Sequence, residues 1–243
     1  MLKLRLNPGA DIQKTSLSLK YFIKFLVVFA FVSACVDEEN AMDADMGYFP
    51  LETGLFHIYT VQETRYTPGA AQVLYYELMT EVVDSFSSEN QLIYAIHRSR
   101  RPGETEPWEP LDTWSARIDK HAVIVSEGNT SFIKAKFPVS AVNRWDGNAL
   151  NTLGADEYRF IDIYQPVEIG GMTFEKTVTV EEEQNDDVIV FRDGRRDIYA
   201  LGIGLVYSET IQLNYCTDDI CLGQQIIEDG REMRMAIKEY GKH

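Results

Sequence analysis

Apolar and polar residues alternate along most of the chain after residue 54, and this period of two predicts β-strands. The alternation is clearest at 73–86, and a polar turn at 87–90 joins this run to a second one at 92–98. Two such runs joined by a short polar turn are typical of an antiparallel hairpin. Shorter runs of the same kind predict further strands at 55–61, 114–118, 122–126, 131–137, 157–164 and 172–181.

The longest alternating run lies near the C-terminus, where apolar residues occupy one face of the segment 199–215. Gly202 and Gly204 leave the opposite face bare, and glycines in a strand permit strong coiling of the sheet. We therefore expect one long strand that bends near residues 208–209, because a straight strand of this length would be unusually extended. It should pair with a return strand at 231–240.

The segment before this run contains two local signals. Asp193-Gly194 lies between apolar runs at 188–191 and 198–199, and Asp-Gly in that position is a strong hairpin signal. The acidic run 181–187 is expected to be a solvated turn, and calcium binding is the alternative interpretation. The sequence thus predicts a turn on either side of a short strand at 188–191.

These patterns predict an all-β protein with a single antiparallel domain of about ten strands. Outside the N-terminal segment, no stretch has the period of a helix. The bare glycine face favours a coiled sheet that closes into a partial barrel. A two-layer sandwich is the alternative architecture.

The first 34 residues have the three-part pattern of a secretory signal. Lys20 and Lys24 precede an apolar run at 25–32, which ends in small residues before Cys35. The run is too short to span a bilayer, which takes roughly 20 apolar residues. We expect a signal-peptide helix at 1–34, an acidic flexible tether at 35–47 and a β-rich domain at 48–243.

The end of this segment, Val32-Ser33-Ala34-Cys35, resembles the lipobox of bacterial lipoproteins. That resemblance implies cleavage before Cys35, acylation of its thiol, and attachment to a membrane through the N-terminal acyl chains. Two or three chains hold a protein far more firmly than one, because each buried CH₂ adds ~0.8 kcal/mol. The alternatives are an ordinary cleaved signal that leaves Cys35 as a free thiol, and an uncleaved anchor helix.

Three further segments resemble elements of uncharacterised lipoproteins of the Bacteroidetes type. Val36-Asp37-Glu38-Glu39 resembles the acidic export signal that directs such proteins to the outer face of the outer membrane. Tyr48-Phe49-Pro50-Leu51 and Gly202-Ile203-Gly204-Leu205-Val206 resemble two elements of their domains, although His57 stands where an aromatic residue is expected. The resemblance implies a lipid-anchored protein at the cell surface. A plain solvated tether, with the domain on the periplasmic face, is the alternative.

The chain contains three cysteines, Cys35, Cys216 and Cys221. Acylation of Cys35 leaves an even pair, which accounts for the odd count in an exported protein. We expect Cys216 and Cys221 to form a disulfide across the end of the long hairpin. A redox or metal-binding dithiol is the alternative, but no third or fourth soft ligand lies nearby in the sequence.

The charge of the chain excludes nucleic acid as a partner. The whole sequence has a formal net charge of −15, and removal of residues 1–34 leaves 18 positive and 37 negative charges, a net charge of −19. Such a surface repels polyanions, and no long basic stripe offsets the repulsion.

No catalytic signature is present, so we expect no enzyme activity, no catalytic residue, no cofactor and no metal ion. Neither HExxH nor GxSxG nor a phosphate-binding glycine loop occurs, and the four histidines are scattered: His57, His97, His121 and His243. Asp146-Gly147-Asn148 with Asn151 offers oxygen ligands but lacks the spacing of an EF-hand loop. Basic residues at 97–101 and 192–196 are expected to pair with nearby carboxylates. An anionic sugar or phosphate is their alternative partner.

Two functions fit an acidic, membrane-anchored β domain. The first is a non-enzymatic binding module that holds an apolar molecule or a glycan on a concave face or between loops. The second is a structural or assembly partner of an outer-membrane protein complex. An apolar, water-accessible cavity of a few hundred Å³ favours the first function, and a filled interior counts against it. An exposed apolar patch or an open strand edge favours the second.

Overall fold

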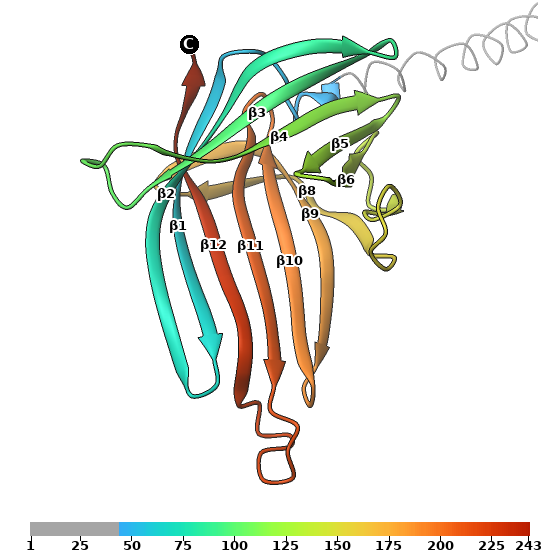
Figure 1. The fold of residues 1–243 in the computed structure, drawn as a ribbon. Coiled ribbons are helices and arrows are strands. Elements are labelled where there is room, and N and C mark those ends of the chain that lie inside the picture. Colours follow the sequence, from blue (N-terminus) through green and yellow to red (C-terminus); the bar gives the residue numbers. More distant parts are fainter. Residues whose placement is uncertain (1–43) are drawn as a thin grey trace, which may run out of the picture. The chain divides into compact units, whose positions relative to one another are not determined.

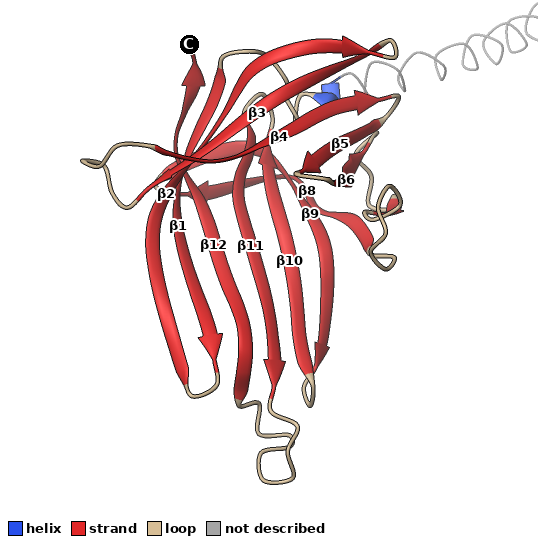
Figure 2. Ribbon diagram, viewed as in Figure 1, coloured by secondary structure: helices blue, strands red, loops and turns tan. Residues whose placement is uncertain are grey.

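The computed structural model describes residues 44–243, which form one sheet of 12 strands, all of them antiparallel to their neighbours. Apart from a helical turn at 44–46, this part of the chain consists of strands and their connections (Figure 2). The all-β prediction is therefore confirmed. The strands are β1 (Leu55–Thr67), β2 (Ala70–Ser88), β3 (Gln91–Arg101), β4 (Glu109–Asp119), β5 (Ala122–Glu127), β6 (Thr130–Lys136), β7 (Arg144–Asp146), β8 (Glu157–Ile169), β9 (Met172–Asp187), β10 (Phe191–Ala200), β11 (Gly204–Tyr215) and β12 (Ile227–Lys242).

The order of strands in the sheet is β6-β5-β4-β3-β2-β1-β12-β11-β10-β9-β8-β7. Every pair of neighbours is also consecutive in the chain, except that the first and last strands pair in the middle. The fold is therefore two meanders, β1–β6 and β7–β12, joined along β1 and β12. Figure 1 shows the lower parts of β1, β2 and β9–β12 extending together to one end, while β3–β6 cross over the upper part.

The two edges of this sheet come together and close most of its upper part. The amide of Ile133 in β6 donates to the carbonyl of Gly147, which follows β7, at 2.9 Å. The indole Nε1 of Trp145 in β7 donates to the carbonyl of Ile133 at 2.8 Å, and the side-chain Nδ2 of Asn151 donates to the Ser131 carbonyl at 2.9 Å. Edges that bond to each other make a partial barrel, so the coiled-sheet prediction is confirmed over the sandwich.

Buried side chains gather in the closed part of the sheet. One cluster joins the two edge regions and includes Val123 of β5, Trp145 of β7, and Tyr158 and Phe160 of β8. A second cluster lies where β1 and β12 meet and includes Tyr59, Val206 and Ile237. Both clusters follow from the period-two alternation, because inward positions of a coiled sheet are screened from water.

The expected single strand at 199–215 is two strands. β10 ends at Ala200, residues 201–203 form a turn, and β11 begins at Gly204. Gly202 and Gly204 have φ angles of +77° and +103°, a region that favours glycine, so these residues turn the chain rather than coil a strand. The register of β11 is regular at 208–209, where a bend was predicted, and its irregularity lies at Val206, whereas the return strand at 231–240 is confirmed within β12.

The predicted hairpin at Asp193-Gly194 is also wrong. Both residues lie inside β10 and pair with β9 on one side and β11 on the other. The turn between β9 and β10 is instead formed by Val188, Ile189 and Val190. The acidic run 181–187, expected to be a turn, belongs to β9, because basic residues of other strands pair with its carboxylates.

The packed domain begins earlier than predicted. Asp45 is buried, its Oδ2 accepts a hydrogen bond from the amide of Val139 at 2.8 Å, and its Oδ1 accepts one from the hydroxyl of Tyr164 at 3.0 Å. Residues 44–47 therefore belong to the domain and not to a flexible tether. The predicted signal peptide, Cys35 and the rest of the predicted tether lie outside the described residues.

The structure joins Cys216 and Cys221 in a disulfide, as predicted, within the connection between β11 and β12. The amide of Cys216 also donates to the carbonyl of Ile226 at 2.8 Å, which closes the base of this loop. The alternative of a free dithiol is therefore not supported by the structure.

Replacing both Cys216 and Cys221 with Ser is expected to lower the free energy of unfolding by about 2 kcal/mol, since a short loop gains little from a cross-link. Urea unfolding of the variant and of the unmodified protein measures the difference. Two thiols that alkylate freely in the native, oxidised protein would contradict the disulfide itself.

Candidate functional site

The inner face of the coiled sheet encloses a cavity of about 490 Å³. Its walls come from strands of both meanders and from the segment before β1. The apolar part of the lining includes Val61, Tyr76, Leu78, Ile96, Ala116, Val123, Val125, Phe132, Leu205, Met233 and Met235. The charged part includes Arg98, Glu127, Lys134, Glu182, Arg195, Asp197 and Arg231. The space is therefore a cavity with walls of mixed chemistry.

The polarity of the inner face changes along the four strands β1, β12, β11 and β10. Strand register places inward side chains in rows that cross these strands, one residue from each. Three successive rows, from the closed part toward the open end, are Val61-Met235-Ser208-Asp197, Glu63-Met233-Thr210-Arg195 and Arg65-Arg231-Gln212-Asp193. The first two rows mix apolar and polar residues, and the third row is entirely polar.

Two β-bulges aim charged side chains into the cavity. Val123 pairs with Ala135 and Ile124 with Ile133, which leaves Lys134 as the extra residue of β6. In β9, Glu181 and Glu183 pair with Arg196 and Arg195, which leaves Glu182 extra in the same way. A bulge re-aims a side chain that regular alternation would place elsewhere. Lys134 and Glu182 therefore meet although they lie on strands far apart in the sheet.

Lys134 is the positive centre of this charged group. Its Nζ lies 3.1 Å from Glu182 Oε1 and 3.4 Å from Glu127 Oε1, and the side chains of Lys134 and Glu182 are only 16% and 9% exposed. Burial alone would lower the pKa of Lys134, but the neighbouring carboxylates outweigh it and hold the pKa well above its ordinary value. Lys134 therefore remains charged and compensates the buried acids.

Asp197 is the most perturbed acid of the group. It is buried, and it accepts a hydrogen bond from the hydroxyl of Tyr199 at 3.0 Å. Burial, with the nearby charge of Glu182, raises the pKa of Asp197 to about 6, against the opposing charge of Lys134. The cavity wall therefore gains or loses a proton in the mildly acidic range.

Replacing Asp197 with Asn is expected to change how stability depends on pH. Because its pKa is raised in the folded state, Asp197 adds stability below its ordinary pKa, and that contribution is lost as pH rises through about 6. From pH 4 to pH 7 the natural protein should lose up to about 3 kcal/mol relative to the Asn variant. Urea unfolding at several pH values measures this. Asp219→Asn, in the exposed loop, is the control, and parallel pH curves for Asp197→Asn would contradict the assignment.

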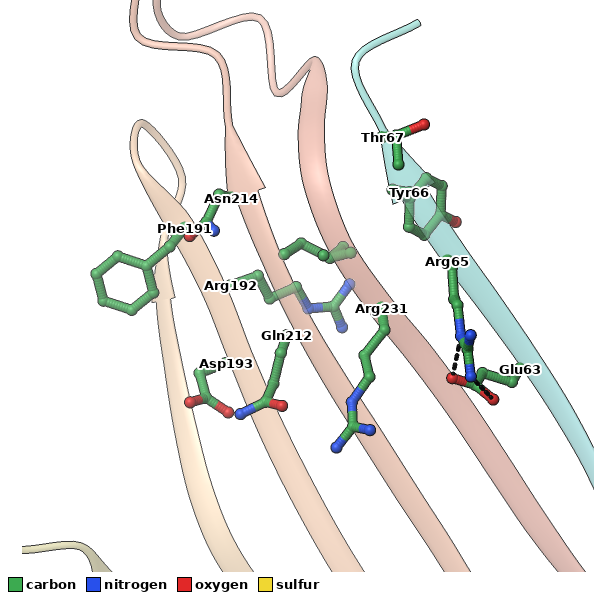
Figure 3. Close-up of a pocket in the computed structure, with 12 residues that line it drawn as sticks. Glu63, Arg65, Tyr66, Thr67, Phe191, Arg192, Asp193, Gln212, Asn214 and Arg231 are labelled. Atoms are coloured by element: carbon green, nitrogen blue, oxygen red, sulfur yellow. Dashed lines mark hydrogen bonds and ion pairs between the residues drawn. The ribbon is translucent and has the colours of Figure 1, made fainter. Parts of the chain in front are cut away.

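A second hollow, of about 670 Å³, lies on the sheet toward the open end of the long strands (Figure 3). Arg65 donates from Nε to Glu63 Oε1 at 2.7 Å and from Nη2 to Glu63 Oε2 at 3.2 Å, the dashed contacts of Figure 3. Gln212 and Arg231 line both this hollow and the inner cavity. The two spaces therefore adjoin at these side chains.

The basic residues singled out in the sequence are mostly ion-paired, as expected. Arg98 pairs with Asp112 at 3.2 Å and Arg196 with Glu209 at 3.0 Å. Arg195 donates to Asp156 and Asp193 at 2.8 and 2.9 Å. The remaining pairs are Arg101 with Glu77 and, more loosely, Arg192 with Asp186. These side chains are therefore committed to structural contacts.

The Asp146 loop uses its oxygens internally. Asp146 Oδ1 accepts hydrogen bonds from the amides of Asn148 and Asp156, at 2.9 and 3.0 Å, and the Asn148 side chain donates to the carbonyl of Gly154. Within residues 44–243, no group of three or more His, Cys, Asp or Glu side chains is arranged to hold a metal ion. In the same part of the chain, no helix has the length and hydropathy needed to cross a bilayer.

Sequence reasoning missed the residues that give the cavity its polarity. Lys134 and Glu182 could not be assigned to a face, because a bulge interrupts the alternation at each. Asp197 and Arg231 could have been recognised, because each lies two residues before an apolar residue of the same strand face, Tyr199 and Met233 respectively. A charged residue that continues an apolar face is an inward-facing charge.

No protein-family model matches the sequence, and no curated protein matches it. Two solved structures align with 80% of this chain and 98% of their own. One is a candidate exported protein with a YmcC-like fold from Bacteroides fragilis, 12% identical with a TM-score of 0.43. The other is a candidate lipoprotein from Parabacteroides distasonis, 9% identical with a TM-score of 0.43. The basis for a functional assignment is therefore the cavity.

Proposed function

We propose that the domain is a non-enzymatic binding module that holds an elongated, largely apolar molecule inside the coiled sheet. The observation that carries this proposal is the cavity of about 490 Å³ among apolar side chains. Ligand sites of proteins commonly enclose 300–1,000 Å³ and combine apolar walls with a few polar groups. A sheet that served only as a structural element would be expected to fill this space with side chains.

The contacts within the cavity favour binding over catalysis. Its charged groups pair with one another, as Lys134 does with Glu182. The Nε2 atom of His57 is hydrogen-bonded to the backbone carbonyl of Ile203 and not to a hydroxyl or thiol. A nucleophile and a base in hydrogen-bond contact are the usual sign of covalent catalysis.

An apolar ligand fits the aromatic residues better than a glycan does. Sugars stack on exposed aromatic faces, but the guanidinium of Arg98 lies 3.8 Å from the centre of the Trp114 ring. Trp114 lines the cavity, so a cation already occupies one face of the only tryptophan in the lining, and the alkyl and thioether groups of the lining are the better contacts for a ligand. A glycan is the alternative occupant.

We also propose that acyl chains on Cys35 hold the protein at the outer membrane, with the domain on the cell surface. Cys35→Ser should move the protein from the membrane fraction to the soluble fraction. Protease added to intact cells should then degrade the domain of the unmodified protein. Full protection of the domain would place it on the periplasmic face instead.

A titration with N-phenyl-1-naphthylamine, an uncharged apolar fluorophore, tests the binding function. We expect saturable enhancement of fluorescence with one site per chain, because of the two hollows described it is the inner cavity whose lining is largely apolar. The same titration in the presence of neutral oligosaccharides separates an apolar ligand from a glycan. A folded protein that gives no saturable signal would overturn the proposal.

One observation favours the second function, docking on an envelope protein complex. Two adjacent connections at the open end of the sheet expose large apolar side chains, and the amide of Tyr215 donates to the carbonyl of Val190 to hold them together. The exposed residues are Val188, Ile189, Val190, Ile220, Leu222 and Ile226. If this patch docks on an outer-membrane complex, Ile220→Asp should abolish co-purification with that complex and leave fluorophore binding unchanged.

A further inference from the structure

Two arginines face each other directly across β1 and β12 at the open end of the inner face. Arg65 is the register partner of Arg231, and Arg231 is the register partner of Gln212 in β11. Like charges directly opposite in an antiparallel pair repel each other. The ion pair between Arg65 and Glu63 offsets only part of this repulsion.

Arg231 lacks a corresponding carboxylate. Within residues 44–243 its guanidinium makes no ion pair and no side-chain hydrogen bond, whereas Arg65, Arg195 and Arg234 each have a carboxylate partner. Glu63 is already engaged by both Arg65 and the hydroxyl of Tyr76, at 3.3 Å. A guanidinium has five donors in a planar fork that matches the oxygens of carboxylate and phosphate.

The position of Arg231 connects the two hollows. It lines the open one together with Arg65, and it lines the inner cavity together with Gln212. The next inward residues of the same strand face are Met233 and Met235, which lead into the apolar part of the cavity. A head group at Arg231 would therefore have an apolar path beside it.

We propose that the cavity takes an amphiphile with an anionic head, and that Arg231, with Arg65 and Gln212, binds its carboxylate, phosphate or sulfate group. The apolar chain of the ligand extends past Met233 and Met235 into the closed part of the sheet. The anion gives Arg231 a hydrogen-bonded partner of its own, because Glu63, whose charge also acts on Arg231, is already bonded to Arg65. This inference rests on the proposed binding function and specifies its ligand.

The test is displacement of bound N-phenyl-1-naphthylamine by three amphiphiles of equal chain length, each below the concentration at which it forms micelles. Dodecanoate and dodecyl phosphate carry the expected anionic heads, and dodecyltrimethylammonium carries a cationic one. The natural protein should bind both anions more tightly than the cation. Arg231→Gln should weaken binding of both anions about tenfold more than it changes the affinity for the uncharged fluorophore or the cation, because the loss of one charge-assisted hydrogen bond affects only an anionic head.

Arg234→Gln is the matched control. It removes one positive charge from the same strand, but Arg234 faces outward and pairs with Glu209 at 2.8 Å. Equal losses of anion affinity in the two variants would mean that only net charge matters, and would overturn the inference. So would equal affinities for all three amphiphiles while the fluorophore still binds. Failure of the fluorophore itself to bind would instead overturn the proposed function, and this inference with it.

Discussion

Replacing Lys134 with Met is expected to lower the free energy of unfolding by about 3 kcal/mol, because removal of one partner leaves buried charges uncompensated. Lys134 is the cation closest to Glu182 and Glu127, and its charge also offsets that of Asp197. Methionine keeps most of the side-chain volume, so the loss reports the charge and not a void. Urea unfolding at neutral pH measures the change.

Two further variants separate this charge effect from a general effect on β6. Lys136→Met removes the same charge from an exposed position two residues away, and should change stability by less than about 0.5 kcal/mol. Adding Glu182→Gln to Lys134→Met should restore a large part of the lost stability, because one of the uncompensated acids is gone. Equal effects of Lys134→Met and Lys136→Met on the free energy of unfolding would show that Lys134 does not stabilise the buried acids.

Replacing Ala116 with Phe is expected to reduce fluorophore affinity about a hundredfold or more, since even one methylene in a tight pocket matters. Ala116 is 2% exposed, lines the cavity from β4, and belongs to neither of the apolar clusters that fill the closed part. A ring added at this position therefore enters the space proposed for the ligand. The fold should survive at a cost of about 1–3 kcal/mol.

Thr113→Phe is the control for this variant. Thr113 lies on the same strand, is exposed, and is the register partner of His97 on the outer face. The control should bind the fluorophore with unchanged affinity. Binding that survives Ala116→Phe in a folded protein would mean that the fluorophore occupies another surface.

The strands were predictable because buried and exposed positions alternate along them, as they do in β1 from Tyr59 to Gln62. The hairpin at 73–98 and the short strands at 114–137 follow the alternation closely, and the structure has them as β2 to β6. The partial barrel was predicted correctly from Gly202 and Gly204, but for the wrong reason. These glycines form a turn, and the closure comes from bonds between the edges, such as Trp145 to Ile133.

The errors near residue 190 have one physical cause. Composition alone predicts a strand for the apolar residues 188–191 and a turn for the acidic residues 181–187. In the structure, partners distant in sequence reverse this order, because Lys134 and Arg159 compensate the acids of β9. A prediction that uses only residues adjacent in the sequence cannot take such contacts into account.

The candidate site was less predictable than the fold. Its charged residues meet through register and bulges: Lys134 and Glu182 are 48 residues apart in sequence. Only the alternation along their strands could have indicated that Asp197 and Arg231 are inward-facing charges. The cavity itself is a property of the closed sheet, and alternation along single strands does not indicate whether the interior is filled.

Native mass spectrometry of the full chain, extracted from membranes with mild detergent, shows whether the inner cavity holds a ligand. We expect a chain that carries one small molecule, released on collision, and we expect the Ala116→Phe variant to lack it while Thr113→Phe retains it. Natural and variant proteins that are equally free of any small molecule would rule out the proposed binding function.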